Sequence, residues 1–276
     1  YRRYDPADIV PPPSFGDDLS GRPAIYRRIQ QVWDRLEWAD FARATAAYYA
    51  FCSLIDDQVG RVRAALERTG QLENTLVVYV SDHGDYMGAH RLLLKGIPAF
   101  EEAYRVPLVL RGPGIPGGQV VPQRVNHLDL AASLLSLLGV DDRQSEARRS
   151  GLPQVGRSLH PLLSGAPADR AARDGWSSQH FAECHGQRFH YTQRVLWHAQ
   201  YKYVFNGFDR DEFYDLADDP YELRNRADDP ALRPLIEEMA ARMWQMMQQT
   251  GDYNMTDAEY GMFRFAPLGP QAGKKD

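Results

Sequence analysis

A short run of β-branched and aromatic residues, Thr75-Leu-Val-Val-Tyr-Val80, constrains the fold more than any other stretch of the sequence. The run is as long as a buried strand and too short for a typical helix. A polar turn follows at once, Ser81-Asp82-His83-Gly84-Asp85. In open α/β sheets, ligands bind beyond the C-terminal ends of strands, where loops hold polar side chains around a crevice. The pattern therefore predicts an α/β fold with a ligand site just after Val80.

The turn carries residue types that suit a divalent cation. Asp82 offers a hard anionic oxygen, and His83 offers a neutral imidazole nitrogen. Gly84 and Gly88 let the backbone turn sharply beside a bound group. Lys95 follows after an apolar run, and its charge could neutralise an anionic substrate. We therefore predict a metal site at Asp82 and His83, with Lys95 close to the substrate.

The segments around this turn predict helices and strands in alternation. A long helix with one apolar face is expected from Asp40 to Arg68, and a shorter one from Ala24 to Leu36. A second buried strand is expected from Val106 to Leu110. A helix should follow from His127 to Leu138, with Asn126 as its cap. Two strands with helices between them indicate a parallel α/β layer.

The pattern changes in the last part of the chain. Four short, aromatic-rich runs joined by Gly or Asp turns predict an antiparallel meander. These runs are Gln179–Glu183, Phe189–Leu196, Tyr201–Phe205 and Glu212–Leu216. A helix is expected after them, from Pro230 to Gln249. At the other end, the proline-rich residues 1–24 predict an irregular surface strap.

Charge and composition argue against several classes of protein. With 43% hydrophobic residues the chain is globular, and its net charge of −5 with mixed signs leaves no basic stripe for nucleic acid. No apolar run approaches the roughly 18 residues of a membrane span. Two cysteines at unrelated positions form no disulfide framework. The first residues lack the apolar segment of a signal peptide. In a truncated chain this says nothing about export, so the periplasm and the cytoplasm both fit.

The Ser-Asp-His-Gly turn resembles that of the sulfatases in the alkaline-phosphatase-like superfamily. In this family a Ser-Asp-His-Gly or Ser-Asp-Asn-Gly turn lies late in the core domain. Further segments resemble, in the same order, the family's next strand and exit loop, the helix after it and two later stretches. These segments are Tyr104–Gly114, Asn126–Gly139, Gly156–Leu159 and Glu212–Asn225. The resemblance covers residues 40 to 230.

Two parts of the family's pattern are not visible in the sequence. Sulfatases carry, near the start of the core, two metal-binding aspartates and a Cys-x-Pro-x-Arg or Ser-x-Pro-x-Arg segment whose first residue becomes a formylglycine nucleophile. Cys184-His-Gly-Gln-Arg188 has a similar spacing, but glycine stands at its centre and it lies far downstream. The pairs Asp56-Asp57 and Asp17-Asp18 do not follow an apolar strand. The chain is thus interpreted as the C-terminal portion of a sulfatase-like protein.

The resemblance implies a fold class and a division of the chain. The expected α/β fold has an alkaline-phosphatase-like, mostly parallel sheet flanked by helices, with a smaller C-terminal subdomain of antiparallel sheet and helix. Residues 1–24 would form the strap, and residues 25–165 the C-terminal part of the core. Residues 166–276 would form the antiparallel subdomain, with its helix and a tail.

The resemblance also implies hydrolysis of sulfate monoesters, such as sulfated sugars or aryl and alkyl sulfates. Asp82 and His83 would bind the metal, and Lys95 would hold a sulfate oxygen and offset charge on the leaving oxygen. His90 would either contact the substrate or orient the turn. Calcium is the family's usual metal, and the histidine beside Asp82 leaves manganese or another transition metal open. The nucleophile would lie outside this chain, which by itself should be incomplete and inactive.

Two other functions stay open. Relatives of the sulfatases use the same metal turn to cleave phosphodiesters or phosphonate monoesters, and these residues do not separate a tetrahedral sulfate from a phosphate. The second alternative is a non-catalytic remnant that binds an anion or a partner. The oligomeric state is not predicted.

Overall fold

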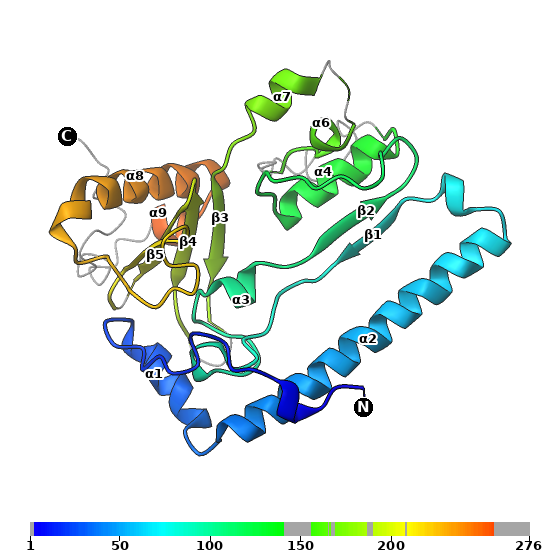
Figure 1. The fold of residues 1–276 in the computed structure, drawn as a ribbon. Coiled ribbons are helices and arrows are strands. Elements are labelled where there is room, and N and C mark those ends of the chain that lie inside the picture. The colour runs from blue at the N-terminus through cyan, green and yellow to red at the C-terminus, as the bar shows by residue number, and fades with distance from the viewer. Residues whose placement is uncertain are drawn as a thin grey trace. The chain divides into compact units, whose positions relative to one another are not determined.

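The computed structural model describes residues 3–140, 156–164, 166, 169–186, 190–207 and 209–256 (Figure 1). The chain divides into two compact units. Unit 1 comprises Tyr1–Pro113, Gly186–Phe189 and Asp218–Asn225, and unit 2 comprises Gly114–His185, His190–Ala217 and Arg226–Asp276. The division of the chain expected at residues 24 and 165 stays a prediction, and the expected C-terminal tail lies largely outside the described residues.

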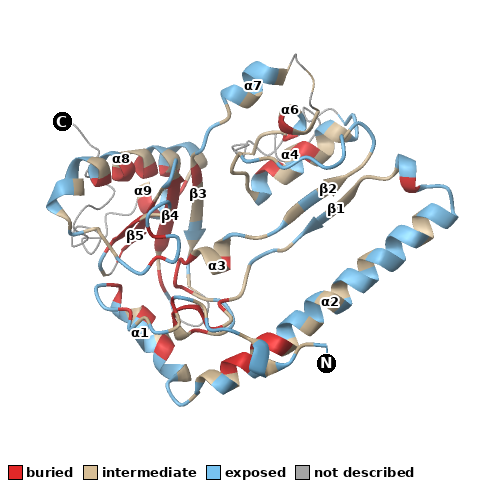
Figure 2. Ribbon diagram, in the orientation of Figure 1, coloured by how far each residue is buried: buried red, intermediate tan, exposed pale blue. Residues whose placement is uncertain are grey.

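Unit 1 is built around one long helix. Helix α1 (Ala24–Gln30) continues as a 3-10 turn and is followed by α2 (Trp38–Arg68), so both predicted helices are confirmed. A capping box between Glu37 and Asp40 starts α2. Gly70, in the left-handed region with φ +68°, follows its end. Although α2 has an apolar face, its buried residues lie only in its first turns, as Figure 2 shows in red.

The remainder of unit 1 contains a two-stranded ladder, sheet A. Strand β1 (Val77–Val80) pairs with β2 (Leu108–Arg111), with Val77 opposite Arg111 and Val80 opposite Leu108. The two strands run antiparallel, so the prediction that they run parallel is wrong. A parallel pair needs a crossover connection, usually a helix on the sheet face. Here the connection holds only a 3-10 turn at Ala89–Arg91 and the four-residue helix α3 (Glu101–Tyr104), and the chain turns back beside β1.

Two segments distant in sequence complete unit 1. The predicted strap lies on α2, where the Tyr4 hydroxyl is 2.8 Å from Ser53 Oγ and its ring meets Tyr49 edge-on. Segment Asp218–Asn225 reaches the strap as well, because Asn225 Nδ2 donates a 2.8 Å hydrogen bond to the Gly21 carbonyl. The strap and segment Asp218–Asn225 therefore contact each other across about 200 residues of sequence.

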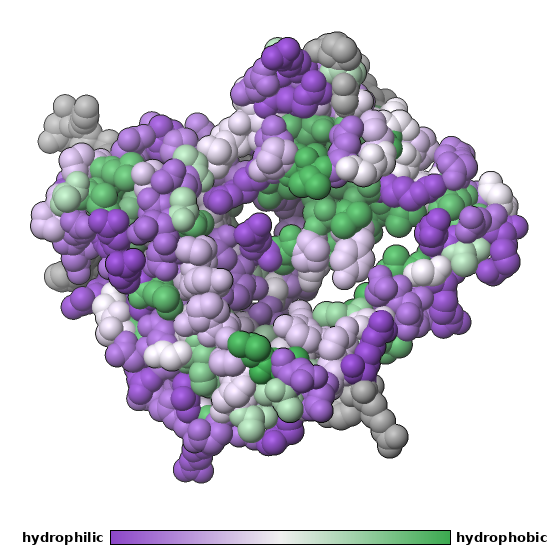
Figure 3. Space-filling model, viewed as in Figure 1, coloured by the Kyte–Doolittle hydropathy of each residue, from purple (hydrophilic) through white to green (hydrophobic). Residues whose placement is uncertain are grey.

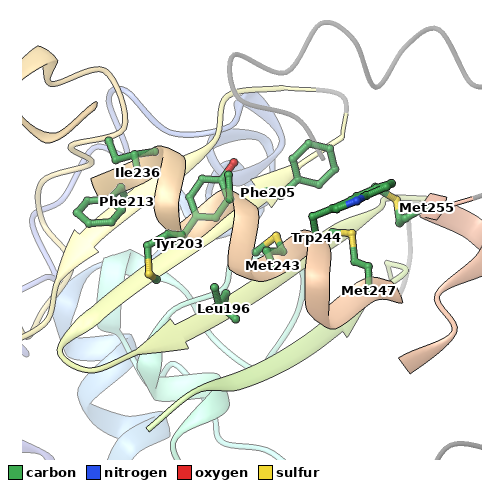
Figure 4. Close-up of a cluster of buried hydrophobic side chains, with 11 residues drawn as sticks. Leu196, Tyr203, Phe205, Phe213, Ile236, Met243, Trp244, Met247 and Met255 are labelled. Carbon is green, nitrogen blue, oxygen red and sulfur yellow. The ribbon is translucent and has the colours of Figure 1, made fainter. Parts of the chain in front are cut away.

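Unit 2 contains sheet B, four antiparallel strands in the order β3-β4-β5-β6, which confirms the predicted meander. The strands are β3 (His180–Cys184), β4 (Gln193–His198), β5 (Tyr201–Asn206) and β6 (Glu212–Asp215). Helix α8 (Arg233–Thr250), close to the predicted helix, covers one face of the sheet. Figure 4 shows the buried core between them, with Leu196, Tyr203, Phe205, Phe213, Ile236, Met243, Trp244, Met247 and Met255.

The other helices of unit 2 are α4 (His127–Leu137), α6 (His160–Leu163), α7 (Arg170–Asp174) and α9 (Tyr253–Thr256). Asn126 caps α4 as predicted, accepting a 3.1 Å hydrogen bond from the Asp129 amide. Gly156 is required beside this helix, because a Cβ there would lie 2.0 Å from the Leu128 carbonyl oxygen. Among the described helices, none combines the length and the apolar character needed to cross a bilayer.

Candidate active site

The predicted metal ligands lie together directly after β1. The His83 amide donates a 2.9 Å hydrogen bond to Asp82 Oδ1, and His83 Nε2 lies 3.6 Å from Asp82 Oδ2. His83 Nδ1 is 2.9 Å from the Gly84 carbonyl oxygen, which can only accept, so Nδ1 carries the proton. Nε2 therefore presents its lone pair beside the Asp82 carboxylate. Both side chains reach solvent, with 86% of Asp82 and 43% of His83 exposed.

This geometry can hold a cation between two ligands. Adjacent ligands at about 2.4 Å from a calcium ion lie about 3.4 Å apart, close to the separation seen here. The pair is nevertheless only part of a metal site, because the described residues contain no group of three or more His, Cys, Asp or Glu side chains placed to bind one ion. The remaining ligands would be water, substrate or side chains from other polypeptide. An oxygen and an imidazole nitrogen are compatible with manganese, and also with calcium if its other ligands are oxygens.

Gly84 fixes this turn by close packing and not by an unusual backbone angle. A Cβ at position 84 would lie 1.8 Å from the Glu102 carbonyl oxygen, so no other residue fits. The Gly84 amide also donates a 2.9 Å hydrogen bond to the Ala103 carbonyl. The turn after β1 is thereby held against α3.

The loop from Asp85 to Leu94 is backbone-strained. Four of its non-glycine residues have φ between +40° and +64°, namely Met87, His90, Arg91 and Leu94. Such angles are uncommon outside glycine, and they persist only where surrounding contacts maintain them. Here the Tyr86 amide bonds the Leu94 carbonyl at 2.8 Å, and the Gly88 amide bonds the Leu92 carbonyl at the same distance. These hydrogen bonds hold the loop in its strained conformation.

His90 is fully buried below the loop surface. Its Nδ1 donates a 2.7 Å hydrogen bond to Asp17 Oδ2, and its ring stacks on Phe100 with 3.5 Å between centroids. Gln30 Nε2 donates a 2.7 Å hydrogen bond to the His90 carbonyl. The other ring nitrogen, Nε2, has no hydrogen-bond partner among the described residues. Of the two predicted roles, this environment favours orienting the loop over contact with substrate.

Lys95, in contrast, is exposed and makes no hydrogen bond or ion pair with the described residues. The residues after it are rigidly held, because the Tyr86 hydroxyl donates a 2.6 Å hydrogen bond to the Pro98 carbonyl. The Ala99 amide donates a 3.1 Å hydrogen bond to the Tyr26 hydroxyl. The exposed Lys95 ammonium thus extends from a backbone segment that hydrogen bonds hold in place, which suits a group that binds an anion. The roles of Asp82, His83, His90 and Lys95 nevertheless stay predictions.

Three buried residues that the sequence did not single out complete this part of unit 1. Arg22 forms a 3.2 Å ion pair with Asp17, and its side chain is 1% exposed. Glu222 is buried as well, and its Oε2 accepts a 2.7 Å hydrogen bond from the Glu101 amide. Asp17 was noted only as half of an adjacent carboxylate pair. No local pattern reveals the bond of Asp17 to His90 or that of Glu222 to the Glu101 amide, because the partners lie 73 and 121 residues apart.

Two models of known protein families match this chain. The Sulfatase family model matches residues 11–140. The model for the C-terminal region of N-sulphoglucosamine sulphohydrolase matches residues 88–249, which is more than half of the 276 residues. Both matches include the predicted anion-binding residue Lys95, and the first also includes the metal turn.

Individual proteins show the same likeness. The choline-sulfatase of Rhizobium meliloti is 30% identical over 211 residues, which cover 74% of this chain and 38% of that protein. The solved structure of BT1596, a 2-O GAG sulfatase, has a TM-score of 0.71 at 26% identity and covers 91% of this chain and 51% of its own. The phosphonate monoester hydrolase of Agrobacterium radiobacter has a TM-score of 0.66 at 28% identity, over 78% of this chain and 43% of its own.

The chain thus spans about half or less of the length of these proteins. The structural likeness confirms the predicted α/β, alkaline-phosphatase-like fold class. The predicted metal turn lies within the residues that the Sulfatase family model matches. The chain therefore belongs to the sulfatase family of the alkaline-phosphatase-like superfamily.

Proposed function

We propose that this chain is the C-terminal part of a sulfate monoester hydrolase. One observation carries the proposal. Two lone-pair donors, Asp82 Oδ2 and His83 Nε2, lie side by side at the end of β1, and a free ammonium at Lys95 follows on an ordered loop. A cation site followed by a free positive charge suits a small anionic ester. The sulfatases among the relatives support sulfate as the anion.

In this proposal Asp82 and His83 would hold the divalent metal. When bound, the cation would polarise an ester oxygen and draw negative charge toward itself. Lys95 would bind another oxygen of the anion and stabilise the charge that develops on the leaving oxygen. Asp82 hydrogen bonds to the His83 amide, and that bond holds the two ligands in one orientation. Calcium and manganese are the two ions to test first.

The nucleophile, a formylglycine in the proposed mechanism, would come from polypeptide outside this chain. The surface of unit 1 supports a need for further polypeptide. Helix α2 presents exposed apolar side chains beyond its first turns, including Phe51 at 60% and Val62 at 60% exposure. Val109 of sheet A is 59% exposed. Figure 3 shows hydrophobic surface in green over sheet A and along α2, where further parts of a sulfatase core would pack.

A phosphonate or phosphodiester hydrolase is the second candidate. The likeness to the phosphonate monoester hydrolase supports it, and the same cation and lysine would bind a tetrahedral phosphoryl group. A panel of matched sulfate and phosphonate esters separates the two. A third candidate, a non-catalytic anion-binding module, would bind sulfate or phosphate without turnover in any longer protein that contains this chain.

Metal binding gives the first test on the chain itself. We expect weak calcium and manganese binding by titration calorimetry, because two protein ligands leave the ion mostly hydrated. Asp82→Asn should abolish this binding, whereas Asp56→Asn, on the exposed surface of α2, should leave it unchanged. Equal binding by both variants would contradict the site. Ester hydrolysis by the purified 276-residue chain, lost in Asp82→Asn, would show that the nucleophile lies within this chain.

Lys95 gives a second test, in a protein that contains this chain and has measurable turnover. Lys95→Ala should lower kcat about a hundredfold or more, because one preorganised contact to the developing charge is lost. Metal content and melting temperature should stay close to those of the parent, since Lys95 is exposed and makes no bond with the described residues. A lower melting temperature with normal turnover would remove Lys95 from the site.

A further inference from the structure

We propose that Asp17 and Glu222 are positioning residues for the loop that carries Lys95, and that His90 transmits the constraint from Asp17. The inference rests on the proposed role of Lys95 in binding the ester anion. Lys95 lies between His90 and Glu101, and each of these two positions is held by a buried carboxylate from a distant segment. Fixing both ends of the loop fixes the point from which the lysine reaches out.

The first end is held by Asp17, and each of its two carboxylate oxygens has two polar partners. Oδ2 accepts from His90 Nδ1 at 2.7 Å and lies 3.2 Å from Arg22 Nη2. Oδ1 accepts from the Leu19 amide at 3.1 Å and from Arg22 Nη1 at 3.3 Å. The side chains of Asp17, Arg22 and His90 are 7%, 1% and 0% exposed. This carboxylate therefore fixes the rotation of the imidazole and is itself fixed by a guanidinium.

The second end is held by Glu222. Its carboxylate accepts a 2.7 Å hydrogen bond from the Glu101 amide, at the start of α3. Arg22 connects the two ends, since the guanidinium that pairs with Asp17 also donates to the Glu222 carbonyl. The Arg22 guanidinium thus joins Asp17 of the strap to the segment that carries Glu222.

The loop between these ends needs such restraint. Arg91 and Leu94 have positive φ angles, so the unrestrained loop would relax toward other conformations. His90 transfers the restraint by stacking on Phe100, on the far side of Lys95. A buried polar cluster of this kind is often no more stabilising than apolar residues of equal volume, but its directional bonds select one geometry. We therefore expect this polar cluster to determine where the loop lies more than how stable the fold is.

The lysine content of the chain allows a direct measurement. Lysines occur only at positions 95, 202, 274 and 275, so selective isotope labelling of lysine gives a spectrum of four residues. In Asp17→Ala, the Lys95 signals should shift, and amide exchange over residues 91–100 should accelerate by at least about tenfold. Asp18→Asn is the matched control, because this neighbouring carboxylate is exposed and bonds the Ser20 amide. The control should behave as the parent does.

Variants at His90 separate positioning from general packing. His90→Phe keeps a ring on Phe100 but removes the donor to Asp17, and His90→Asn keeps a donor near the Nδ1 position. We expect fast loop exchange in His90→Phe and a return toward the parent rate in His90→Asn. Glu222→Met should accelerate exchange at the Glu101 end. If Asp17→Ala does not fold, Asp17→Asn, which keeps one acceptor oxygen, takes its place with a smaller acceleration.

Failure of the positioning role and failure of the proposed function give different results. If Asp17→Ala and His90→Phe lower the melting temperature but leave Lys95 signals and loop exchange as in the control, the positioning role is wrong. These readouts need no turnover, so a parent protein that hydrolyses no ester would contradict the proposed function and leave this result standing. Where hydrolysis is measured, Asp17→Ala should lower kcat about ten- to hundredfold with KM within about threefold, because a displaced lysine still meets the substrate.

Discussion

Sheet A is almost entirely apolar and sheet B carries several polar residues, yet only sheet B is enclosed. In β4, β5 and β6 nearly every residue is buried, including Gln193, Arg194 and Lys202. In β1 all four residues are apolar, and none of them is buried. A strand that is apolar on both faces is typical of a sheet covered on both sides. Burial here follows the presence of a covering layer more closely than it follows the hydrophobicity of the strand.

The covering layer of sheet B is α8, which belongs to the same unit. Among the described residues of unit 1, no helix covers sheet A in a comparable way, and two strands alone are marginally stable in water. Helix α2 shows the same contrast along its length, since its buried residues, Phe41, Ala42, Thr45 and Ala46, all lie near its start. Unit 2 thus has a self-sufficient core, and unit 1 has a structured loop beside uncovered apolar surfaces.

Truncating a core side chain should give the largest difference in lost stability between the two sheets. Phe213→Ala removes a fully buried ring from the core under α8 and should destabilise sheet B by about 3–5 kcal/mol. Val109→Ala in sheet A should cost less than about 1 kcal/mol, because the side chain is already in solvent. Native-state hydrogen exchange of the amides in each sheet measures both. Equal losses in the two sheets would mean that sheet A is covered in solution.

The buried ion pair of unit 2 should give the next largest effect. Arg194 donates to Asp252 from Nε and Nη2, and both side chains are buried. Asp252→Ala should cost about 3 kcal/mol, because it leaves a buried guanidinium with weaker partners. Asp228→Ala, which breaks the exposed pair with Arg210, should cost less than about 1 kcal/mol. Urea unfolding followed by tryptophan fluorescence compares the two variants. Similar midpoints would contradict the larger contribution of the buried ion pair.

A third effect, of similar size, should depend on pH. Burial raises the pKa of Asp211 from its usual 3.8 to about 7, despite hydrogen bonds from the Tyr203 hydroxyl and the Asn206 amide. Between these two values the folded state binds the proton that the unfolded chain has lost, so this residue makes stability fall as pH rises, and the fall ends near pH 7. These two values correspond to a loss of about 3–4 kcal/mol between pH 4 and 7.5.

Asp211→Asn isolates this contribution from other titrating groups. Asparagine has the shape of the protonated acid and cannot ionise, so the difference in unfolding free energy between parent and variant should change with pH. A constant difference from pH 4 to 7.5 would show that Asp211 ionises normally. No corresponding change is expected in the amides of sheet A.

Much of this fold is predictable from local pattern. The spacing of one apolar face predicts α2, and the short aromatic runs predict sheet B, with a helix expected after them close to α8. The direction of β2 was predicted wrongly, because strand direction depends on the path of the connection and not on the strand's own residues. The place of Asp82 and His83 after β1 follows from the strand and turn. The burial of His90 does not, because its partner Asp17 lies 73 residues earlier.

The bond between Arg22 and the Glu222 carbonyl spans 200 residues of sequence. A ribosome must therefore make four-fifths of this chain before the contact can form. Until then the strap, α2 and β1 are present without their last partner, and long-range closure of this kind is slow. Newly made chains would pass through a period in which their apolar surfaces attract chaperones or one another. The yield of soluble protein could thus depend on translation rate, even though the finished fold does not.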